Sequence, residues 1–82
     1  MKGVVKFTNE ERSLFAVETD NGFTVFGFVD TDNIESGDVV SRSRESAACD
    51  SLFDYSRDAE LVVYVRDMVP TLEAAEALVY SD

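Results

Sequence analysis

The sequence predicts a small, mainly β domain: a barrel of about five to six antiparallel strands with a short C-terminal helix. Two patterns indicate this class. Short runs rich in β-branched and aromatic residues recur along the chain, and turn-forming residues separate them. The third observation is size, because 82 residues with 45% hydrophobic content suit a single domain with one core, which we expect to span residues 1–82.

The first three predicted strands form a meander at residues 3–8, 13–19 and 23–29. A polar turn at residues 9–12 joins the first two, and Asp20-Asn21-Gly22 joins the second to the third. Asn-Gly supplies the positive φ angles that tight hairpin turns require, so the second and third strands are expected to pair directly.

The third of these strands is apolar on both of its sides. Successive side chains in a strand alternate, so Phe23 and Val25 point one way while Phe26 and Phe28 point the other way. One small core can use only one of these sides. The second side must therefore be covered by another element, meet a partner or remain an exposed patch.

The second half of the chain predicts three more strands and a connecting loop. Residues 30–38 are polar and turn-rich, and Ile34 is the one side chain there that is suited to anchoring the loop in a core. The strands are expected at residues 38–42, 51–57 and 60–67, the last two pairing across a short turn.

A short helix is predicted over residues 71–80. Thr71 can cap its N-terminus, and an apolar stripe runs along it at helical spacing. Isolated helices of fewer than roughly 12 residues are marginal in water, so this one must dock on its own barrel or on another chain.

Composition limits the classes of function. The formal net charge of −10 opposes attraction to nucleic acid and to anionic membranes, and it favours solubility or a basic partner. No apolar run approaches the roughly 20 residues of a membrane-spanning helix, and no signal peptide is evident, so we expect a soluble, cytoplasmic protein that does not bind membranes.

Catalytic and metal chemistry find little support. The chain has no histidine, which removes the commonest neutral-pH acid–base residue, and we expect no enzyme. Its single cysteine, Cys49, excludes an intrachain disulfide and a thiolate zinc cluster within one chain. The acidic loop that begins with Asp30 and contains Asp32 departs from the EF-hand pattern of calcium ligands at three positions. We therefore expect no metal site and no cofactor.

The first half of the chain resembles the cold-shock domain. The resemblance lies in three segments, which read Lys-Gly-Val-Val-Lys-Phe-Thr-Asn-Glu-Glu-Arg over residues 2–12, Val-Phe-Gly-Phe over residues 25–28 and Glu-Ser-Gly-Asp-Val-Val over residues 35–40. It implies a five-stranded OB-type barrel that binds single-stranded RNA and DNA. Together with the strand pattern, the resemblance implies an OB-like or SH3-like barrel.

The family's base-stacking motifs are altered in this chain. Family members have Lys-Gly-Phe-Gly-Phe in strand two, where this sequence has Arg-Ser-Leu-Phe-Ala over residues 12–16. In strand three, Phe26 matches the family aromatic and Phe28 replaces a histidine, while Phe7 stands where the family has an exposed tryptophan. A base–aromatic stack contributes ~1–3 kcal/mol, so two lost stacking positions should remove most of the family's affinity.

If the resemblance holds, the outer face of the barrel carries Phe7, Leu14, Ala16, Phe26 and Phe28, and it is apolar. We therefore predict an interaction face made of Phe7, Leu14, Phe26 and Phe28. The leading hypothesis is a non-catalytic protein-interaction or self-association module, whose partner is a protein or a second copy of the chain.

Two alternatives remain open. The first is a divergent single-stranded nucleic-acid-binding OB-type domain, in which Lys2, Lys6 and Arg12 contact phosphates beside the same face. The second is an acidic partner of a basic protein, which the net charge would suit.

Overall fold

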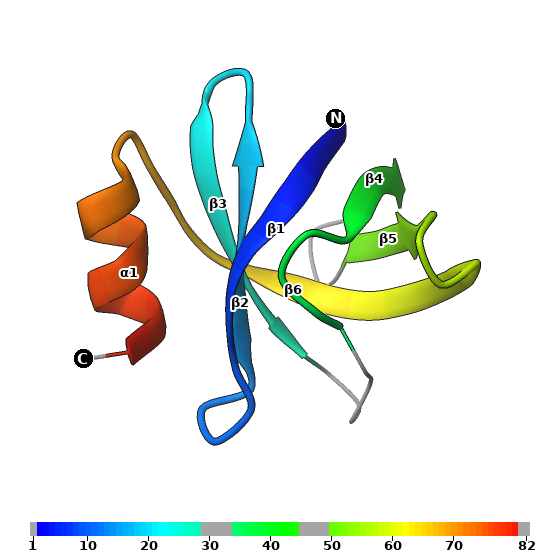
Figure 1. Cartoon of the computed structure of the whole chain (residues 1–82), viewed down its shortest axis with the longest axis horizontal. Coiled ribbons are helices and arrows are strands. Elements are labelled where there is room, and N and C mark those ends of the chain that lie inside the picture. Colours follow the sequence, from blue (N-terminus) through cyan, green and yellow to red (C-terminus); the bar gives the residue numbers. More distant parts are fainter. Residues whose placement is uncertain (1, 29–33, 45–49, 81–82) are drawn as a thin grey trace.

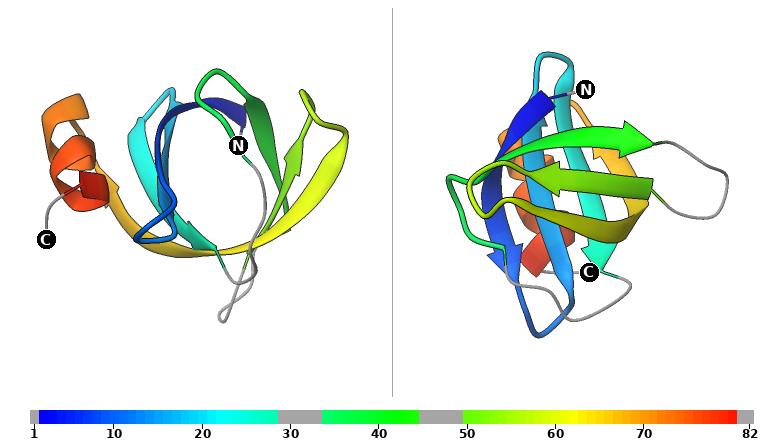
Figure 2. Two further views of the ribbon diagram at one scale, coloured as in Figure 1. Left: turned by 60° about the horizontal axis from the view of Figure 1, so that its bottom comes forward. Right: turned by 90° about the vertical axis from the view of Figure 1, so that its right-hand side faces the viewer.

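A computed structural model of the chain describes residues 2–28, 34–44 and 50–80, with the backbone alone at 42–44 and at 50. It contains a closed barrel of six antiparallel strands and one short C-terminal helix, which confirms the predicted fold class (Figure 1). The elements are β1 (Lys2–Asn9), β2 (Leu14–Thr19), β3 (Gly22–Phe28), β4 (Val39–Arg44), β5 (Asp50–Asp54), β6 (Ala59–Val69) and α1 (Leu72–Tyr80). Around the barrel the order is β1-β2-β3-β6-β5-β4, and α1 lies outside it (Figure 2).

The predicted meander of β1, β2 and β3 is present, with a tight turn between β2 and β3. Thr19 pairs with Gly22, whose φ of 118° is one that glycine adopts without strain. From this turn the register runs without interruption, and it places Phe15 opposite Phe26.

The second half of the barrel differs from the prediction in its strand bounds. β5 ends at Asp54, three residues before the predicted end, because Asp54 Oδ1 accepts the backbone N–H groups of Ser56 at 2.9 Å and Arg57 at 3.3 Å. These bonds turn the chain, and Asp58 then takes a positive φ of 52°. β4 continues to Arg44 and β6 to Val69, two residues beyond the predicted ends.

The inner cluster of the barrel comes from all six strands and one loop. Ile34, predicted as the anchor of its loop, is buried with 7% exposure. The ring of Phe15 lies 5.4 Å from that of Phe26 and 4.9 Å from that of Phe28, measured between centroids. The cluster consists of Val5, Phe15, Val17, Phe26, Ile34, Val40, Leu52, Leu61 and Val63, with Phe28 packed against it.

A second apolar cluster lies between α1 and the outer face of β1, β2 and β3. It consists of Ala16, Phe23, Val25, Ala75 and Val79, with Phe7, Val69 and Leu78 packed against it. The helix therefore docks on its own barrel, one of the two predicted options.

Polar contacts fix both ends of α1. Thr71 Oγ1 accepts the N–H of Ala74 at 3.2 Å, which caps the N-terminus as predicted. At the other end, Asn9 Nδ2 donates to the carbonyl of Val79 at 2.9 Å, and the Tyr80 hydroxyl donates to the carbonyl of Thr8 at 3.0 Å. No helix in the described part of the chain has the length and apolar character needed to cross a membrane.

The expected outward orientation of Phe26 and Phe28 is wrong. Alternation along β3 is as predicted, but Phe26 is fully buried inside the barrel, while Val25 faces outward beneath α1. The reason is the hairpin register, which pairs Phe26 with Phe15 and pairs Leu14 with Gly27. Leu14 and Phe26 therefore point to opposite sides of the sheet, and they cannot share a face.

Candidate interaction surface

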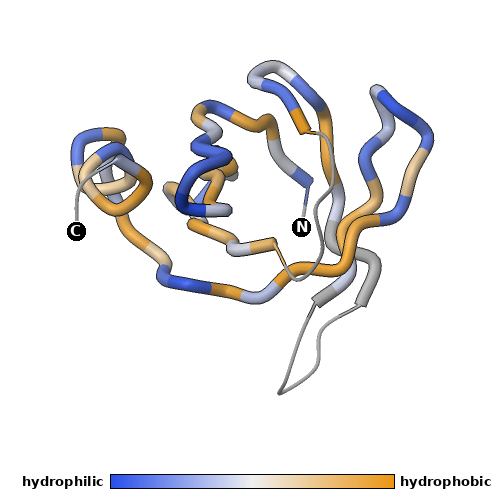
Figure 3. Tube along the Cα trace, turned by 90° about the horizontal axis from the view of Figure 1, so that it is seen from below, coloured by the Kyte–Doolittle hydropathy of each residue, from blue (hydrophilic) through white to orange (hydrophobic). Residues whose placement is uncertain are grey.

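The outer face of β6 carries apolar side chains that α1 does not cover. Leu61 and Val63 point into the barrel and are 3% and 0% exposed. By alternation Val62 and Tyr64 point outward, and they are 38% and 36% exposed. Figure 3 shows the tube through β6 as mostly hydrophobic, with hydrophilic colour near its start and again shortly before it reaches α1.

Two aromatic residues of β5 and its following turn extend this surface. Phe53 lies outward, since its neighbours Leu52 and Asp54 are both fully buried. Its ring meets the ring of Tyr55 edge-on at 4.8 Å, and Tyr55 is 56% exposed. We call Phe53, Tyr55, Val62 and Tyr64 the β5–β6 outer face.

Tyr64 lies flat against the barrel because its cross-strand neighbour is Gly27. A Cβ atom at Gly27 would stand 2.1 Å from Tyr64 Cζ, so only glycine leaves room for the ring in this position. The Tyr64 ring therefore lies over the backbone of Gly27.

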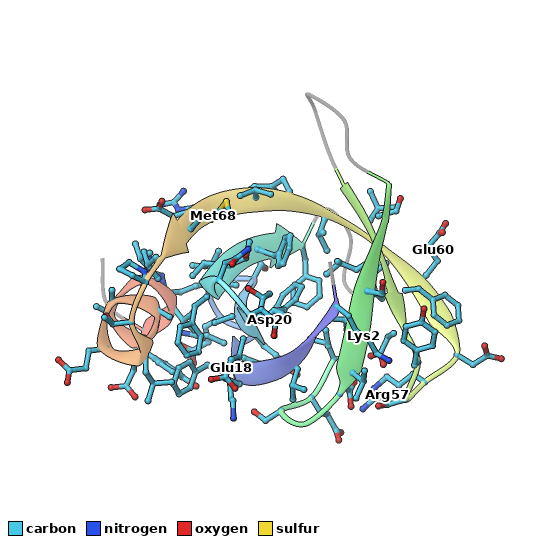
Figure 4. All side chains as sticks on the ribbon, turned by 90° about the horizontal axis from the view of Figure 1, so that it is seen from above. Lys2, Glu18, Asp20, Arg57, Glu60 and Met68 are labelled. Carbon is cyan, nitrogen blue, oxygen red and sulfur yellow. The ribbon has the colours of Figure 1, made fainter. Side chains whose placement is uncertain are left out.

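Charged residues flank Val62 and Tyr64 along β6, and Glu60 is also the cross-strand partner of Phe53. Glu60 precedes Val62, is exposed and projects away from the barrel (Figure 4). Arg66 follows Tyr64 at a bulge, where Val25 pairs with Asp67 and Phe26 pairs with Val65. A bulged residue is left without a cross-strand partner. Arg66 is exposed and makes no ion pair with another residue in the described ranges.

The four residues predicted as an interaction face lie in three different environments. Phe26 is fully buried and Phe28 packs against the inner cluster. Phe7 packs beneath α1, with its ring edge-on to Tyr80 at 6.0 Å. Leu14 is 3% exposed, opposite Gly27. They do not form one surface.

The three cations predicted as phosphate contacts are also separated. Lys2 Nζ lies 5.7 Å from the centre of the Tyr55 ring, a cation–π arrangement at one end of β1. Lys6 Nζ lies 3.2 Å from a carboxylate oxygen of Glu18. Arg12 is half-buried in the turn between β1 and β2 and has an interaction of its own.

A polar cluster that the sequence did not predict closes the barrel where the loop before β4 meets the turn after β5. The two acids at its centre, Asp38 and Asp54, are 8% and 0% exposed. Arg57 Nε donates to Asp38 Oδ2 at 3.1 Å, and its Nη2 lies 3.0 Å from Glu35 Oε1. We call Glu35, Asp38, Asp54 and Arg57 the carboxylate clasp.

The pKa values of the two acids of the clasp are shifted in opposite directions. Burial, and then the adjacent Asp38 carboxyl, raise the pKa of Asp54 above its ordinary value. Burial also acts to raise the pKa of Asp38, but hydrogen bonds from Asp54, the Glu35 backbone and Arg57 outweigh it and hold that pKa below its ordinary value. Asp54 Oδ2 is buried with no hydrogen-bond partner among the described residues, so a proton carried there would let Asp54 donate to the Asp38 carboxylate.

Hydrogen bonds beside the clasp connect the first residue of β4 to the turn after β5. Val39 N–H donates to Ser56 Oγ at 3.1 Å, and Tyr55 N–H donates to the Val39 carbonyl at 2.8 Å. Among the described residues, no group of three or more Cys, Asp or Glu side chains is arranged to hold a metal ion. Asp30 and Asp32 lie outside the described residues. The hydrogen bonds around the clasp join the loop before β4 to the turn after β5, so the clasp closes this part of the barrel.

An open hollow of about 610 Å³ lies on the outer side of β1 and β2 and reaches the start of β4, which pairs with β1. Its lining combines the apolar side chains of Val4 and Val39 with Lys2, Glu18 and Asp20. The labelled side chains Lys2, Glu18 and Asp20 are visible on this side in Figure 4. Charges of both signs around an open depression do not single out a ligand class.

No family model, curated protein or solved structure matches the chain. Any proposal about function therefore rests on the geometry of the chain itself.

One signal in the sequence could have corrected the predicted face. With Asp20 and Asn21 as the turn, each step back along β2 matches one step forward along β3, so Phe26 must lie on the side of Phe15. The outer surface of β6 also had a signal, because the segment is apolar at Val62 and Tyr64 as well as at the positions that face inward.

Proposed function

We propose that this protein is a non-catalytic protein-interaction module that binds its partner through the β5–β6 outer face. The observation that carries the proposal is the exposure of Val62 and Tyr64 on the outward side of β6, at 38% and 36%, with the 56%-exposed Tyr55 in ring contact with Phe53 on the neighbouring strand β5. Contiguous apolar patches on small domains are commonly sites of interaction.

The contrast with the other outer face supports this choice of surface. The outer face of β1, β2 and β3 is also apolar, and α1 covers it with Ala75 and Val79, both fully buried. The helix α1 thus covers one apolar outer face, and the other outer face is exposed to solvent. An accessible face with exposed aromatic rings, flanked by charges, has the composition of an interface centre with a polar rim.

Single-stranded nucleic acid is a weaker candidate partner. The face that would stack bases by family resemblance is the one beneath α1, and Phe26 is inside the barrel. Lys6 is paired with Glu18, and the net charge is −10. We expect no shift of a labelled single-stranded oligonucleotide at low salt, where phosphate contacts are strongest.

Site-specific photo-crosslinking tests the proposal. A benzophenone side chain placed at Val62 in the full chain should form an adduct in an extract of the cells that express the protein. The same group placed at Glu76, exposed on α1, is the matched control. The expected result is an adduct from position 62 and none from position 76.

A second substitution shows whether an adduct reflects binding to this face. Tyr64→Asp should abolish the adduct at position 62, because it places a carboxylate at the centre of the contact, while circular dichroism remains that of the folded protein. Equal yields at the two positions, or an adduct that persists in Tyr64→Asp, would argue against this face as a binding surface.

A further inference from the structure

We infer that the partner of the β5–β6 outer face is a second copy of this chain, stacked face to face with the two β6 strands antiparallel. The inference rests on the proposed function, since it names the partner of the same surface. Its basis is the order of side chains along β6, where Glu60 and Arg66 stand three residues before and three residues after Val63, with Val62 and Tyr64 between them.

This order is self-complementary under a twofold axis. Let the axis run between the two sheets, perpendicular to β6 and level with Val63. Each strand is then reversed on its partner, so that Val62 lies opposite the partner's Tyr64 and Glu60 lies opposite the partner's Arg66. The contact has an apolar centre and two opposite-charge pairs, one at each end.

The alternative stacking places like charges together. If the twofold axis ran along β6, each Glu60 would face the partner's Glu60 and each Arg66 would face the partner's Arg66. Like-charge contacts across an interface oppose association. The charges of the described surface therefore select the antiparallel arrangement.

The shape of the face suits sheet stacking. Stacked sheets pack about 10 Å apart, a gap that side chains from both faces fill. Tyr64 lies flat over Gly27, so its ring does not hold the two sheets apart. Both charged residues are exposed, and in the described part of the chain Arg66 has no carboxylate of its own.

The acidity of the whole chain does not exclude this contact. Exposed charges are screened beyond a Debye length of about 8 Å at physiological ionic strength. Four of the exposed acids lie away from β6, in the turn between β1 and β2 and on α1: Glu10, Glu11, Glu73 and Glu76. Along β6 the exposed acids Glu60 and Asp67 are balanced in part by Arg66.

Charge exchange across the axis provides the test. Glu60→Arg would place a second positive charge opposite the partner's Arg66, and Arg66→Glu would place a second negative charge opposite the partner's Glu60. Each single variant should weaken the dimer roughly 10-fold or more, since both ends of the interface change. An equimolar mixture of the two variants restores opposite charges at both ends, and so does the double variant.

Sedimentation equilibrium over a roughly hundredfold range of concentration measures these species, because a dimer's stability depends on protein concentration. We expect a concentration-dependent dimer for the wild type, mainly monomer for each single variant, and recovery of the dimer in the mixture and in the double variant. Glu76→Arg on α1 changes net charge as Glu60→Arg does, and it should leave the dimer unchanged.

The opposite signs of the two substitutions remove net charge as an explanation. Glu60→Arg makes the chain less acidic and Arg66→Glu makes it more acidic, so a general charge effect would move the dimer in opposite directions. A wild type that stays monomeric, or single variants that dimerise as well as the wild type, would overturn the inference. If the wild type is a monomer but still forms a Tyr64-dependent adduct with another protein at position 62, self-association alone is overturned. If the wild type is a monomer and forms no such adduct, the proposed function is contradicted as well.

Discussion

The two halves of the barrel differ in what covers their outer faces. In the helix-covered half, β1, β2 and β3 have apolar outer faces, and α1 covers them with its own side chains. In the open half, β4, β5 and the first part of β6 have no covering helix, and the carboxylate clasp closes the loops instead. A small barrel can thus bury a second cluster on one side while leaving aromatic residues exposed on the other. Figure 2 shows α1 on one side of the barrel only.

The largest expected effect comes from the interior that both halves share. Phe26→Ala removes a fully buried ring that stacks on Phe15, and it should lower the free energy of unfolding by about 3–5 kcal/mol. Urea denaturation measures the loss, with Phe26→Leu as the milder variant if Ala prevents folding. A cost below about 1 kcal/mol would place the ring outside the packed interior, because exposed sites tolerate such changes.

One substitution made on each outer face compares them directly. Val25→Thr places a hydroxyl beneath α1, where Val25 is fully buried, and we expect a cost of about 1–3 kcal/mol in unfolding free energy. Val62→Thr makes the same change at a position that is 38% exposed, where a change within about 0.5 kcal/mol is expected. Similar costs at the two positions would mean that α1 does not seal its face.

The carboxylate clasp predicts a pH dependence of stability. Because the folded pKa of Asp54 is raised, its contribution is present at low pH and is lost as pH rises through that pKa. Asp38 has a lowered pKa, so its contribution is lost only as pH falls through its own folded pKa. Asp54→Asn keeps an oxygen for the N–H groups of Ser56 and Arg57 and cannot titrate.

Unfolding free energies at several pH values between about 4 and about 8 test this prediction. The difference in unfolding free energy between wild type and Asp54→Asn should change by at most about 1.4 kcal/mol per pH unit. The wild type should become less stable relative to the variant as pH rises. Asp58→Asn, at an exposed acid in the same turn, is the control and should show no such trend. A constant difference across this range would mean that Asp54 titrates like an ordinary carboxyl.

A modest loss of stability is expected at the start of the covering helix. Thr71→Ala removes the oxygen that accepts the N–H of Ala74, and it should cost about 1 kcal/mol. Thr71→Ser should restore most of this stability, and thermal unfolding measures both variants. Equal losses for Ala and Ser would indicate that the methyl group, rather than the cap, stabilises the helix.

The register of the β2–β3 hairpin shows how far sequence reasoning reaches. The turn at Asp20 and Asn21 and the alternation along β3 were predicted, yet the wrong side of β3 was assigned to the outside. Both sides are apolar, so hydrophobicity alone did not separate Phe26 from Val25. The resemblance to a nucleic-acid-binding family favoured an outward position for Phe26, and the pairing of Phe26 with Phe15 contradicts that position.

The clasp lay beyond any local pattern. Asp38 and Asp54 are separated by the whole of β4 and most of β5, and no spacing in the sequence indicates that their carboxyl groups will meet. Even the end of β5 depends on this site, because the carboxylate that turns the chain is part of it. The uncovered β5–β6 outer face likewise follows from where α1 docks.

By itself, the sequence determined the mainly β class, the meander, the terminal helix that must dock and the two-sided apolar character of the central strands. Only the tertiary structure decided which side of each strand faces the interior, which acids meet and which apolar face stays open. The physical reason is that alternation with a period of two fixes side chains relative to one another but leaves two equivalent choices for the whole strand. Closure of the barrel and the position of α1 select between them.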